Sequence, residues 1–330
     1  MSKLMHLTRR NLIIFFKDKR RIFFTFMSPL IVLLCFVLFA RKIYLSQMPE
    51  YLPAKIKDQY ADISMLIGLL SVTSFTNAIS LSSIMVTDTE RKVLNDLYIS
   101  PVRAGIVRFS YLIYNIILNI CITLFIFVIG ICWMGINKTL VVEVKNSDFQ
   151  NMFNIPEILK TLDPSKLANT LNDSSVTKTY YSFDTAKVFI VIGLIILAAF
   201  LNSSLFVFVL SFLNNTSAFS AISASLSAIA GFLIGAFVPL HTFPRAVAEF
   251  SSLIPSTHIS NMFRHFITQG LIFSEKDPII QKLFSEKHAI YDFNILFGQD
   301  IKWWGSLIYT GSWTLLMITL NISLSNLKRK

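Results

Sequence analysis

The chain has 330 residues, of which 54% are hydrophobic and only 15% are charged, and its mean hydropathy is +0.60. This composition excludes a soluble globular domain, whose surface needs more charge, and it excludes disorder, which needs low hydrophobicity. We therefore expect an all-α polytopic membrane protein. The net charge of +11 would suggest a nucleic-acid partner for a soluble protein, but in a membrane protein such a charge reports topology. No nucleic-acid partner is expected.

The first predicted element is an amphipathic helix over residues 2–20. Such a helix would lie in the headgroup layer, with its basic side toward anionic membrane lipid or a partner. The alternative is a simple topology anchor. The basic residues that fall within about 120° of one another on a helical wheel include Lys3, Arg9, Arg10, Lys17 and Arg20.

Six stretches without charge are long enough to cross a hydrocarbon core of about 30 Å as helices. An even number of spans places both termini on one side. The segments that would share this side carry Lys and Arg at more than twice the density of the other loops, which indicates the cytoplasm. We expect a multi-pass protein of a cell membrane, most simply a bacterial plasma membrane. The predicted spans are 22–40, 63–86, 109–135, 188–213, 218–240 and 303–325.

The inner loop 87–108 has a more specific pattern. Thr87 followed by Glu90 matches a capping box, which starts a helix, and Pro101 would end that helix. A short capped helix between two spans forms a rigid knob that can dock in a cleft of a partner and transmit force. The alternative is an ordinary solvated linker. The predicted apolar face of the short helix consists of Val93, Leu94 and Leu97.

Two longer segments lie on the predicted outer side. Segment 136–187 has turn-forming clusters and short mixed stretches such as Thr139–Val144, which predict a small external cap or a disordered insertion. Segment 241–302 precedes the last span. No part of the sequence resembles a separate soluble domain, so residues 1–330 are interpreted as a single transmembrane domain.

The motifs that the sequence lacks restrict its energy source. It has no Gly-x-x-x-x-Gly-Lys-Ser/Thr loop for a nucleotide and no Gly-x-Ser-x-Gly elbow, so no catalytic residue is predicted. The three cysteines lie in apolar runs and the five histidines have no metal spacing, so no metal site is predicted and the histidines are interpreted as interfacial. No span holds an ionisable residue of the kind that ion-driven carriers use. A transporter of this kind must take energy from another subunit, while a passive pore or a membrane scaffold (an immunity protein, for example) remains an alternative.

Three stretches, taken together, resemble the type-2 permease (membrane) subunit of ABC exporters. The run from Arg10 to Leu30 is similar to the interfacial helix of that family, Asp88–Val102 resembles its coupling helix, and residues 239–264 are similar to its external re-entrant segment. The likeness covers nearly the whole chain in order and spacing. It implies that the residues which contact the ATPase are Asp88, Glu90, Arg91, Val93, Leu94, Leu97 and Pro101.

This chain departs from the family pattern in two places. Arg91-Lys92 stands where the family often has Gly-Thr, and segment 136–187 is much longer than usual. The resemblance implies two six-span halves, as a homodimer or a related heterodimer, on two ABC ATPase subunits. ATP and Mg would bind to the ATPase subunits and this chain would hold no cofactor. Closure of the ATPases would push the coupling helices and switch the pathway from inward- to outward-open.

Small and polar residues concentrate in the second and fifth predicted spans. In the family that the chain resembles these spans face the two-fold axis, which predicts a pathway for an amphiphilic substrate such as a drug-like molecule, a lipid-linked compound, a peptide or a glycan. The alternative is close helix packing, because small residues let backbones approach. The candidates are Ser71, Ser74, Asn77 and Ser82 in the second span and Ser220, Ser223 and Ser227 in the fifth.

Overall fold

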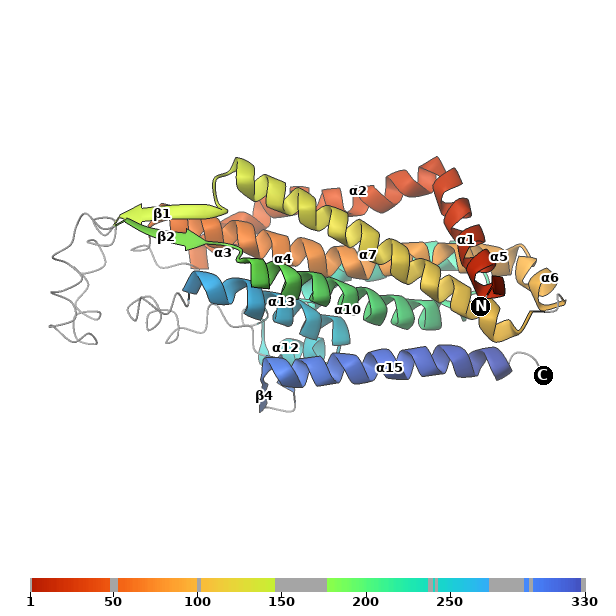
Figure 1. Ribbon diagram of the computed structural model, residues 1–330. Helices are drawn as coiled ribbons and strands as arrows, with labels where there is room; N and C mark the ends of the chain where they lie inside the picture. Colours follow the sequence, from red (N-terminus) through yellow and green to blue (C-terminus); the bar gives the residue numbers. More distant parts are fainter. Residues whose placement is uncertain are drawn as a thin grey trace.

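The computed structural model is an elongated helical bundle with short strands at one end (Figure 1). In its described part, five helices are long and apolar enough to cross a membrane, and they coincide with the first five predicted spans. The chain is therefore an all-α polytopic membrane protein. The sixth predicted span coincides with helix α15 (Trp303–Leu327). The structure describes residues 2–47, 53–99, 102–145, 177–236, 240, 243–272, 294–296 and 299–327.

The N-terminal helix is separated from the first span by a capped break. Helix α1 (Ser2–Lys17) ends before Asp18, whose carboxylate accepts a hydrogen bond from the backbone N–H of Arg21 and so caps α2 (Lys19–Cys35). Helix α2 continues without interruption through a π-helical turn, η1 (Phe36–Ala40), into α3 (Arg41–Gln47). The predicted helix over 2–20 is therefore three residues shorter, and the first span extends beyond both of its predicted ends.

Helix α4 (Ala54–Leu81) is the central helix, and its side chains are buried along nearly all its length. Its 28 residues measure about 42 Å at 1.5 Å per residue, more than a hydrocarbon core needs, so one end projects beyond it. Helix α5 (Ser83–Glu90) continues it after Ser82. The helices that surround it are α2, α7 (Ala104–Ile136), α10 (Thr185–Leu210), α11 (Thr216–Leu233) and α13 (Pro255–Ile272).

A small antiparallel pair of strands sits at the projecting end of α4. Strand β1 (Val141–Lys145) pairs with β2 (Thr177–Tyr181), and the two come from opposite ends of the predicted external segment. A buried polar chain fixes them to α4: Gln59 donates to Ser182, and Thr139 donates to Asp62 at 2.7 Å. The remaining part of that segment, 146–176, lies outside the described residues. A second pair, β3 (Asn294–Leu296) and β4 (Gln299–Ile301), precedes α15.

The segment expected to be re-entrant contains two helices, α12 (Arg245–Ser252) and α13. Helix α13 packs inside the bundle against α4, α10 and α15. His258 on α13 is fully buried, with one ring nitrogen 2.8 Å from the carbonyl oxygen of Ser252 and the other 3.1 Å from the hydroxyl of Ser306. His258, predicted to be interfacial, is thus buried within the chain and joins α12 and α13 to α15.

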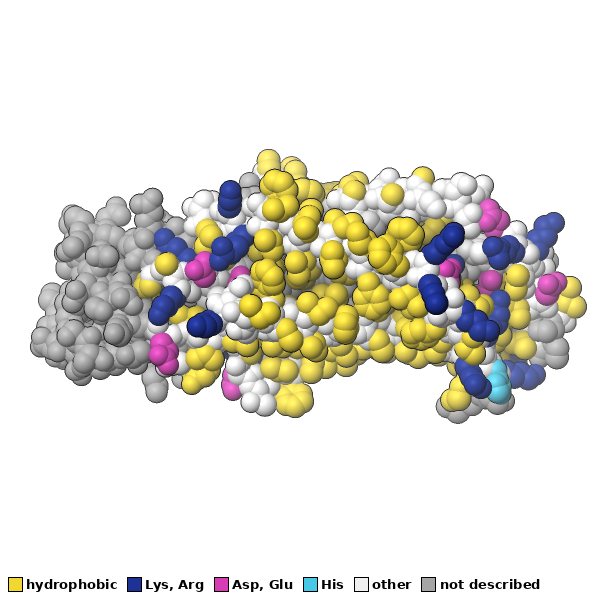
Figure 2. All heavy atoms as spheres, turned by 90° about the horizontal axis from the view of Figure 1, so that it is seen from above, with side chains coloured by type: hydrophobic (Ala, Val, Ile, Leu, Met, Phe, Trp, Pro, Cys, Tyr) yellow, Lys and Arg dark blue, Asp and Glu magenta, His cyan; other side chains and the backbone are white. Residues whose placement is uncertain are grey.

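The surface has the distribution of side chains that a membrane requires. Figure 2 shows one face whose middle is covered by hydrophobic side chains, whereas Lys and Arg gather toward the two ends. Much of the exposed apolar surface belongs to α2 and the π-helical turn η1 that follows it, which present side chains such as Phe23, Leu34 and Phe39. A soluble protein rarely exposes so large an apolar area, but hydrocarbon solvates it without cost.

Close packing around α4 gives a first test of the fold. A Cβ atom at Gly68 would lie 2.7 Å from the carbonyl oxygen of Ala236, which follows α11. We expect Gly68→Ala to reduce the free energy of unfolding by about 1–3 kcal/mol, measured as a lower thermal midpoint in detergent. Gly193→Ala on α10 is the matched control, because nothing lies within 4 Å of its Cβ. Equal thermal midpoints for the two variants would contradict the close contact between Gly68 and Ala236.

Candidate functional site

The cytoplasmic pieces predicted from the sequence lie together at one end of the bundle. Helices α1, α5 and α6 (Val93–Ile99), the start of α7 and the end of α15 all share this end, opposite strands β1 and β2 (Figure 1). The two ends of the described chain are therefore on the same side, as an even number of crossings requires. This end is the candidate coupling site.

The predicted capping box does not start α6. Thr87 and Glu90 lie inside and at the end of α5, and the hydroxyl of Thr87 donates to the carbonyl oxygen of Ser83, one turn earlier. The helix breaks only at Arg91 and Lys92, where Lys92 has a φ of 59°. The capping-box prediction is wrong because α5 is already helical before Thr87. No unpaired backbone N–H groups are therefore left there for Thr87 to cap.

Helix α6 itself forms as predicted, but its apolar face is not free for a partner. Leu94 and Leu97 pack against the apolar cluster of the same chain that contains Phe15 and Val107, and Val93 is half-buried. The outward face of α6 carries other residues. Those exposed on α6 and in the turn before it are Arg91, Lys92, Asn95, Asp96 and Ile99. Pro101, predicted to end the helix, lies outside the described residues.

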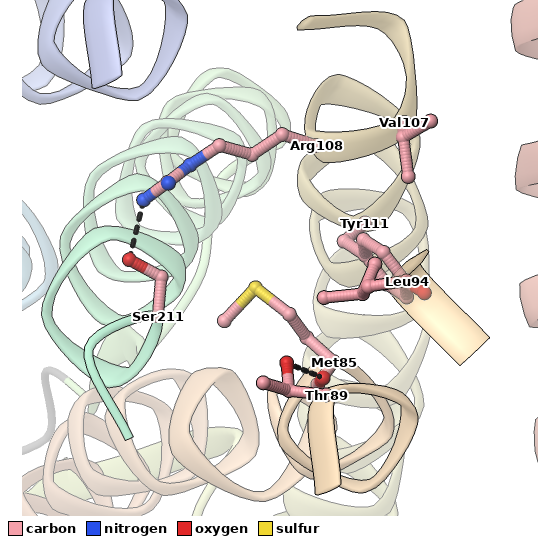
Figure 3. A pocket seen from close by; sticks show the side chains of 7 residues that line it. All are labelled: Met85, Thr89, Leu94, Val107, Arg108, Tyr111 and Ser211. Atoms are coloured by element: carbon pink, nitrogen blue, oxygen red, sulfur yellow. Dashed lines mark hydrogen bonds between the residues drawn. The ribbon is translucent and has the colours of Figure 1, made fainter. Parts of the chain in front are cut away.

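A small cavity lies behind α6 (Figure 3). Its volume of about 30 Å³ is enough for one or two water molecules. The guanidinium of Arg108 reaches across it to donate a hydrogen bond to the hydroxyl of Ser211 at the end of α10, and Leu94 of α6 lies on its wall. A small space therefore remains behind α6, although Leu94 and Leu97 contact the core beside it. The lining residues are Met85, Thr89, Leu94, Val107, Arg108, Tyr111 and Ser211.

A buried carboxylate joins α1, α5 and α7 beside this cavity. Asp88 accepts hydrogen bonds from the guanidinium of Arg10 at 2.9 Å and from the hydroxyl of Tyr111 at 2.5 Å. Burial alone would lower the pKa of Arg10, but the hydrogen bond and charge of Asp88 outweigh burial and raise that pKa above its ordinary value. Two of the predicted site residues, Arg10 and Asp88, thus form an ion pair within the chain, in which Asp88 is buried and the side chain of Arg10 stays 31% exposed.

The remaining basic residues of the N-terminal helix are on its surface. The residues of α1 that are buried against α7 are Thr8, Asn11 and Phe15, while the apolar side chains of Met5 and Phe16 are exposed. An exposed mixture of apolar and basic side chains suits the boundary between headgroups and hydrocarbon. The predicted interfacial residues that are exposed at this end of the chain are Lys3, Arg9, Lys17 and Arg20, and Lys19 is exposed beside them.

Loss of the Asp88 carboxylate should loosen the whole coupling site. Asp88→Ala leaves the buried hydroxyl of Tyr111 without its acceptor and takes the counter-charge from Arg10, which keeps its hydrogen bond to Asn11. We expect the free energy of unfolding to fall by about 2–3 kcal/mol. The measurement is the thermal midpoint of the detergent-solubilised protein. Asp96→Ala, which removes an exposed carboxylate nearby, is the control. A midpoint as high as that of the control would contradict the bridging role of Asp88.

Comparison with known protein families identifies the chain at this point. The family model described as "ABC-2 family transporter protein" matches residues 42–323, which is most of the chain. The chain belongs to the ABC-2 transporter family. It is a permease (membrane) subunit, a membrane transport component whose family works with an ATPase partner in a transporter complex. Among curated proteins no match was found.

In this ABC-2 permease the second predicted span turns its small polar residues inward. Ser74 is fully buried, and its hydroxyl accepts a hydrogen bond from Asn202 on α10, while its carbonyl oxygen accepts one from Asn119 on α7. The hydroxyl of Ser82 accepts a hydrogen bond from the side-chain amide of Asn115 on α7. The other two candidates, Ser71 and Asn77, are also buried. Within the protomer, Ser74 and Ser82 join helices together, as small and polar residues do in membranes.

The fifth predicted span, α11, is the opposite case. Only three of its 18 residues are buried, namely Phe219, Ala230 and Gly231. Ser220 is exposed, whereas Ser223 and Ser227 are half-buried. A helix rich in serine and alanine that is so little covered by its own chain is a poor lipid-facing surface, where bulky apolar residues would be expected. The structure thus separates the two predicted stripes: one is inside the protomer, and the other is on its surface.

A groove runs beside α11 and contains one of the predicted pathway residues. It has a volume of about 370 Å³ and lies between α2 and α11, with α4 as its floor. Its walls are mostly apolar, with the hydroxyl-bearing side chains of Thr76 and Ser227 among them. Sequence reasoning found Ser227 and missed the others. The lining residues are Phe24, Met27, Ile31, Val32, Cys35, Val72, Thr76, Ser227 and Ala228.

Proposed function

We propose that this permease is the membrane-spanning half of an ATP-driven exporter, powered by a separate ATPase subunit. Its substrate is amphiphilic, of the drug-like, lipid-linked, peptide or glycan kind. The chain crosses a bacterial plasma membrane six times, with both termini in the cytoplasm. Two ATPase subunits bind ATP and Mg, and two permease halves, either identical or related, complete the assembly.

The observation that carries the proposal is α6 at the cytoplasmic end. It is short, it is joined to α5 by a two-residue turn, and it exposes both charged and apolar side chains. Ile99 is 85% exposed, which is unusual for an isoleucine on a polar end of a protein and favours a contact with another subunit. The inner face of α6 rests on the protomer core, so a force on its outer face reaches α5 and α7.

The groove between α2 and α11 is the proposed route of the substrate. Apolar walls with a few hydroxyl groups suit a molecule that has both an apolar part and a polar part. A second permease half packed against α2 and α11 would cover the exposed serine face and close the groove into a path. Membrane lipids would contact the rest of α2 and α7.

The decisive experiment is co-purification. A tagged chain extracted from its native membrane in mild detergent is expected to bring down an ATPase subunit, and ATP hydrolysis by the complex should depend on the permease. Reconstituted vesicles then test export of candidate amphiphiles. If no ATPase accompanies the chain, and the vesicles neither conduct nor transport, the result would favour the membrane scaffold that the sequence leaves as an alternative.

A further inference from the structure

The cytoplasmic end of α11 is held by a side chain from α5. Helix α5 ends at Glu90 and α11 begins at Thr216. One carboxylate oxygen of Glu90 accepts a hydrogen bond from the hydroxyl of Thr216 at 2.7 Å, and the other accepts one from its backbone N–H at 3.3 Å. Asn215 completes the cap by accepting from the N–H of Ser217. Glu90 therefore contacts the helix that lines the groove, although its place in the sequence suggested a cap for α6.

Electrostatics favours this contact. The first N–H groups of a helix have no intrahelical acceptor, and they carry the positive end of the helix dipole. The carboxylate of Glu90 satisfies one of them and places a negative charge beside that end. Both hydrogen bonds are exposed to water, so they can break and form again as helices move.

The opposite end of α11 is fixed in a complementary way. The guanidinium of Arg264 on α13 donates to the carbonyl oxygen of Gly235 at 2.6 Å. The hydroxyl of Tyr44 donates to the carbonyl oxygen of Ala236. Gly235 has a φ of 71°, so it turns the chain sharply there. A cation thus holds the negative end of α11 and an anion holds the positive end, while most residues between them are exposed.

A short, rigid connection links α6 to Glu90. The turn between α5 and α6 contains only Arg91 and Lys92, and backbone hydrogen bonds close it from both sides: Arg91 donates to Thr87, and Asn95 donates to Lys92. A displacement of α6 therefore reaches the carboxylate of Glu90 through two residues that have little freedom to absorb it.

We propose that Glu90 is a positioning residue which transmits movement of α6 to α11 and thereby opens or closes the groove. The inference rests on the proposed function, because it takes the driving force from an ATPase docked on α6. It assigns Glu90 to α11 and leaves contact with the ATPase to the outward face of α6.

The test uses the complex of the full chain with its ATPase in lipid nanodiscs. The three native cysteines are replaced by alanine, and spin labels are attached through Ser225→Cys on α11 and Leu315→Cys on α15, both exposed positions. The distance between the labels is measured without nucleotide and with ATP plus vanadate. ATPase binding and ATP hydrolysis are measured on the same samples.

We expect Glu90→Ala and Thr216→Val each to remove at least half of the ATP-dependent shift in label distance, while ATPase binding and hydrolysis persist. The double variant should be no worse than either single variant, and Thr216→Ser, which keeps the hydroxyl, should restore the shift. Glu249→Ala, which removes a carboxylate from α12 at the other end, is the control and should leave the shift unchanged.

Three results would overturn the inference alone. The first two are an unchanged shift in Glu90→Ala and a loss of ATPase binding in that variant, which would place Glu90 at the docking surface. An unaltered complex whose α11 labels do not respond to ATP would also overturn it, even with normal hydrolysis. Failure of the unaltered chain to bind any ATPase would instead remove the proposed function, and this inference with it.

Discussion

Ser74→Phe is expected to abolish folded protein, whereas Ser223→Phe is expected to leave the yield intact and alter transport. Ser74 is fully buried and bonded to Asn202. A phenyl ring there must push packed helices apart, and it leaves the buried amide of Asn202 without its acceptor. The two effects together cost about 4 kcal/mol. Ser223 is half-buried on α11, a helix that lies at the surface of its own chain, so a larger side chain there does not have to displace the core.

The readouts are the amount of monodisperse protein from size-exclusion chromatography and the transport per folded molecule in reconstituted vesicles. Phe125→Leu on the exposed face of α7 is the control for both, and it should change neither. A normal yield of Ser74→Phe would show that α4 does not pack against α10 as described. Normal transport by Ser223→Phe would remove the face of α11 from the proposed pathway.

The second large effect is expected on the outward face of α6. Ile99→Asp places a charge on an isoleucine that is 85% exposed and that we propose to contact the ATPase. A hot-spot residue at the centre of an interface contributes about 2 kcal/mol or more, and for Ile99 in that role this corresponds to roughly thirty-fold weaker ATPase binding. Folding should not change, because the side chain contributes little to the protomer core.

ATPase binding is best measured by titration of the purified subunit against the permease in nanodiscs. Ile136→Asp is the control, since Ile136 is 78% exposed and lies at the far end of α7. Leu97→Asp gives a contrasting result: it buries a charge against the cluster of the protomer, so the thermal midpoint should fall along with binding. Unchanged affinity in Ile99→Asp would exclude this face of α6 as the docking surface.

The spans were predictable because the hydrocarbon core imposes a length and forbids charge. The same rule explains why helix α4 is longer than the predicted span. The prediction begins that span at residue 63, just after Asp62, yet the helix starts at Ala54 and contains Lys55 and Asp58. Hydropathy detects the part of a helix that lies in lipid, and it is silent about a helix that continues into water.

The apparent capping box shows the limit of local patterns. Thr87 and Glu90 have the right spacing, but the same residues fit equally well in the last turns of a longer helix, where a threonine hydroxyl bonds to the preceding turn. Likewise, the spacing of Leu94 and Leu97 predicts one buried face on α6, and it does not say which partner buries it. Only the tertiary structure assigns that face to the chain's own core.

The two serine stripes look alike in sequence, and their environments differ because of residues elsewhere. The useful signal lies in the asparagines of other spans. Asn115, Asn119 and Asn202 stand in apolar helices, where each amide needs a partner. Small hydroxyl residues on α4 are the partners that the structure supplies. The asparagines indicate from the sequence that buried partners are needed, but the sequence alone does not say which of the two serine-rich spans supplies them.

The length of α4 has a consequence for access from outside the cell. On the proposed orientation, its projecting end carries the antiparallel pair β1 and β2, which is fastened to it through Asp62 and Gln59. An antibody fragment that binds these two strands would therefore hold the far end of the same helix whose near end leads into α5 and α6. Inhibition of the proposed exporter would then need no molecule to enter the groove or the cytoplasm.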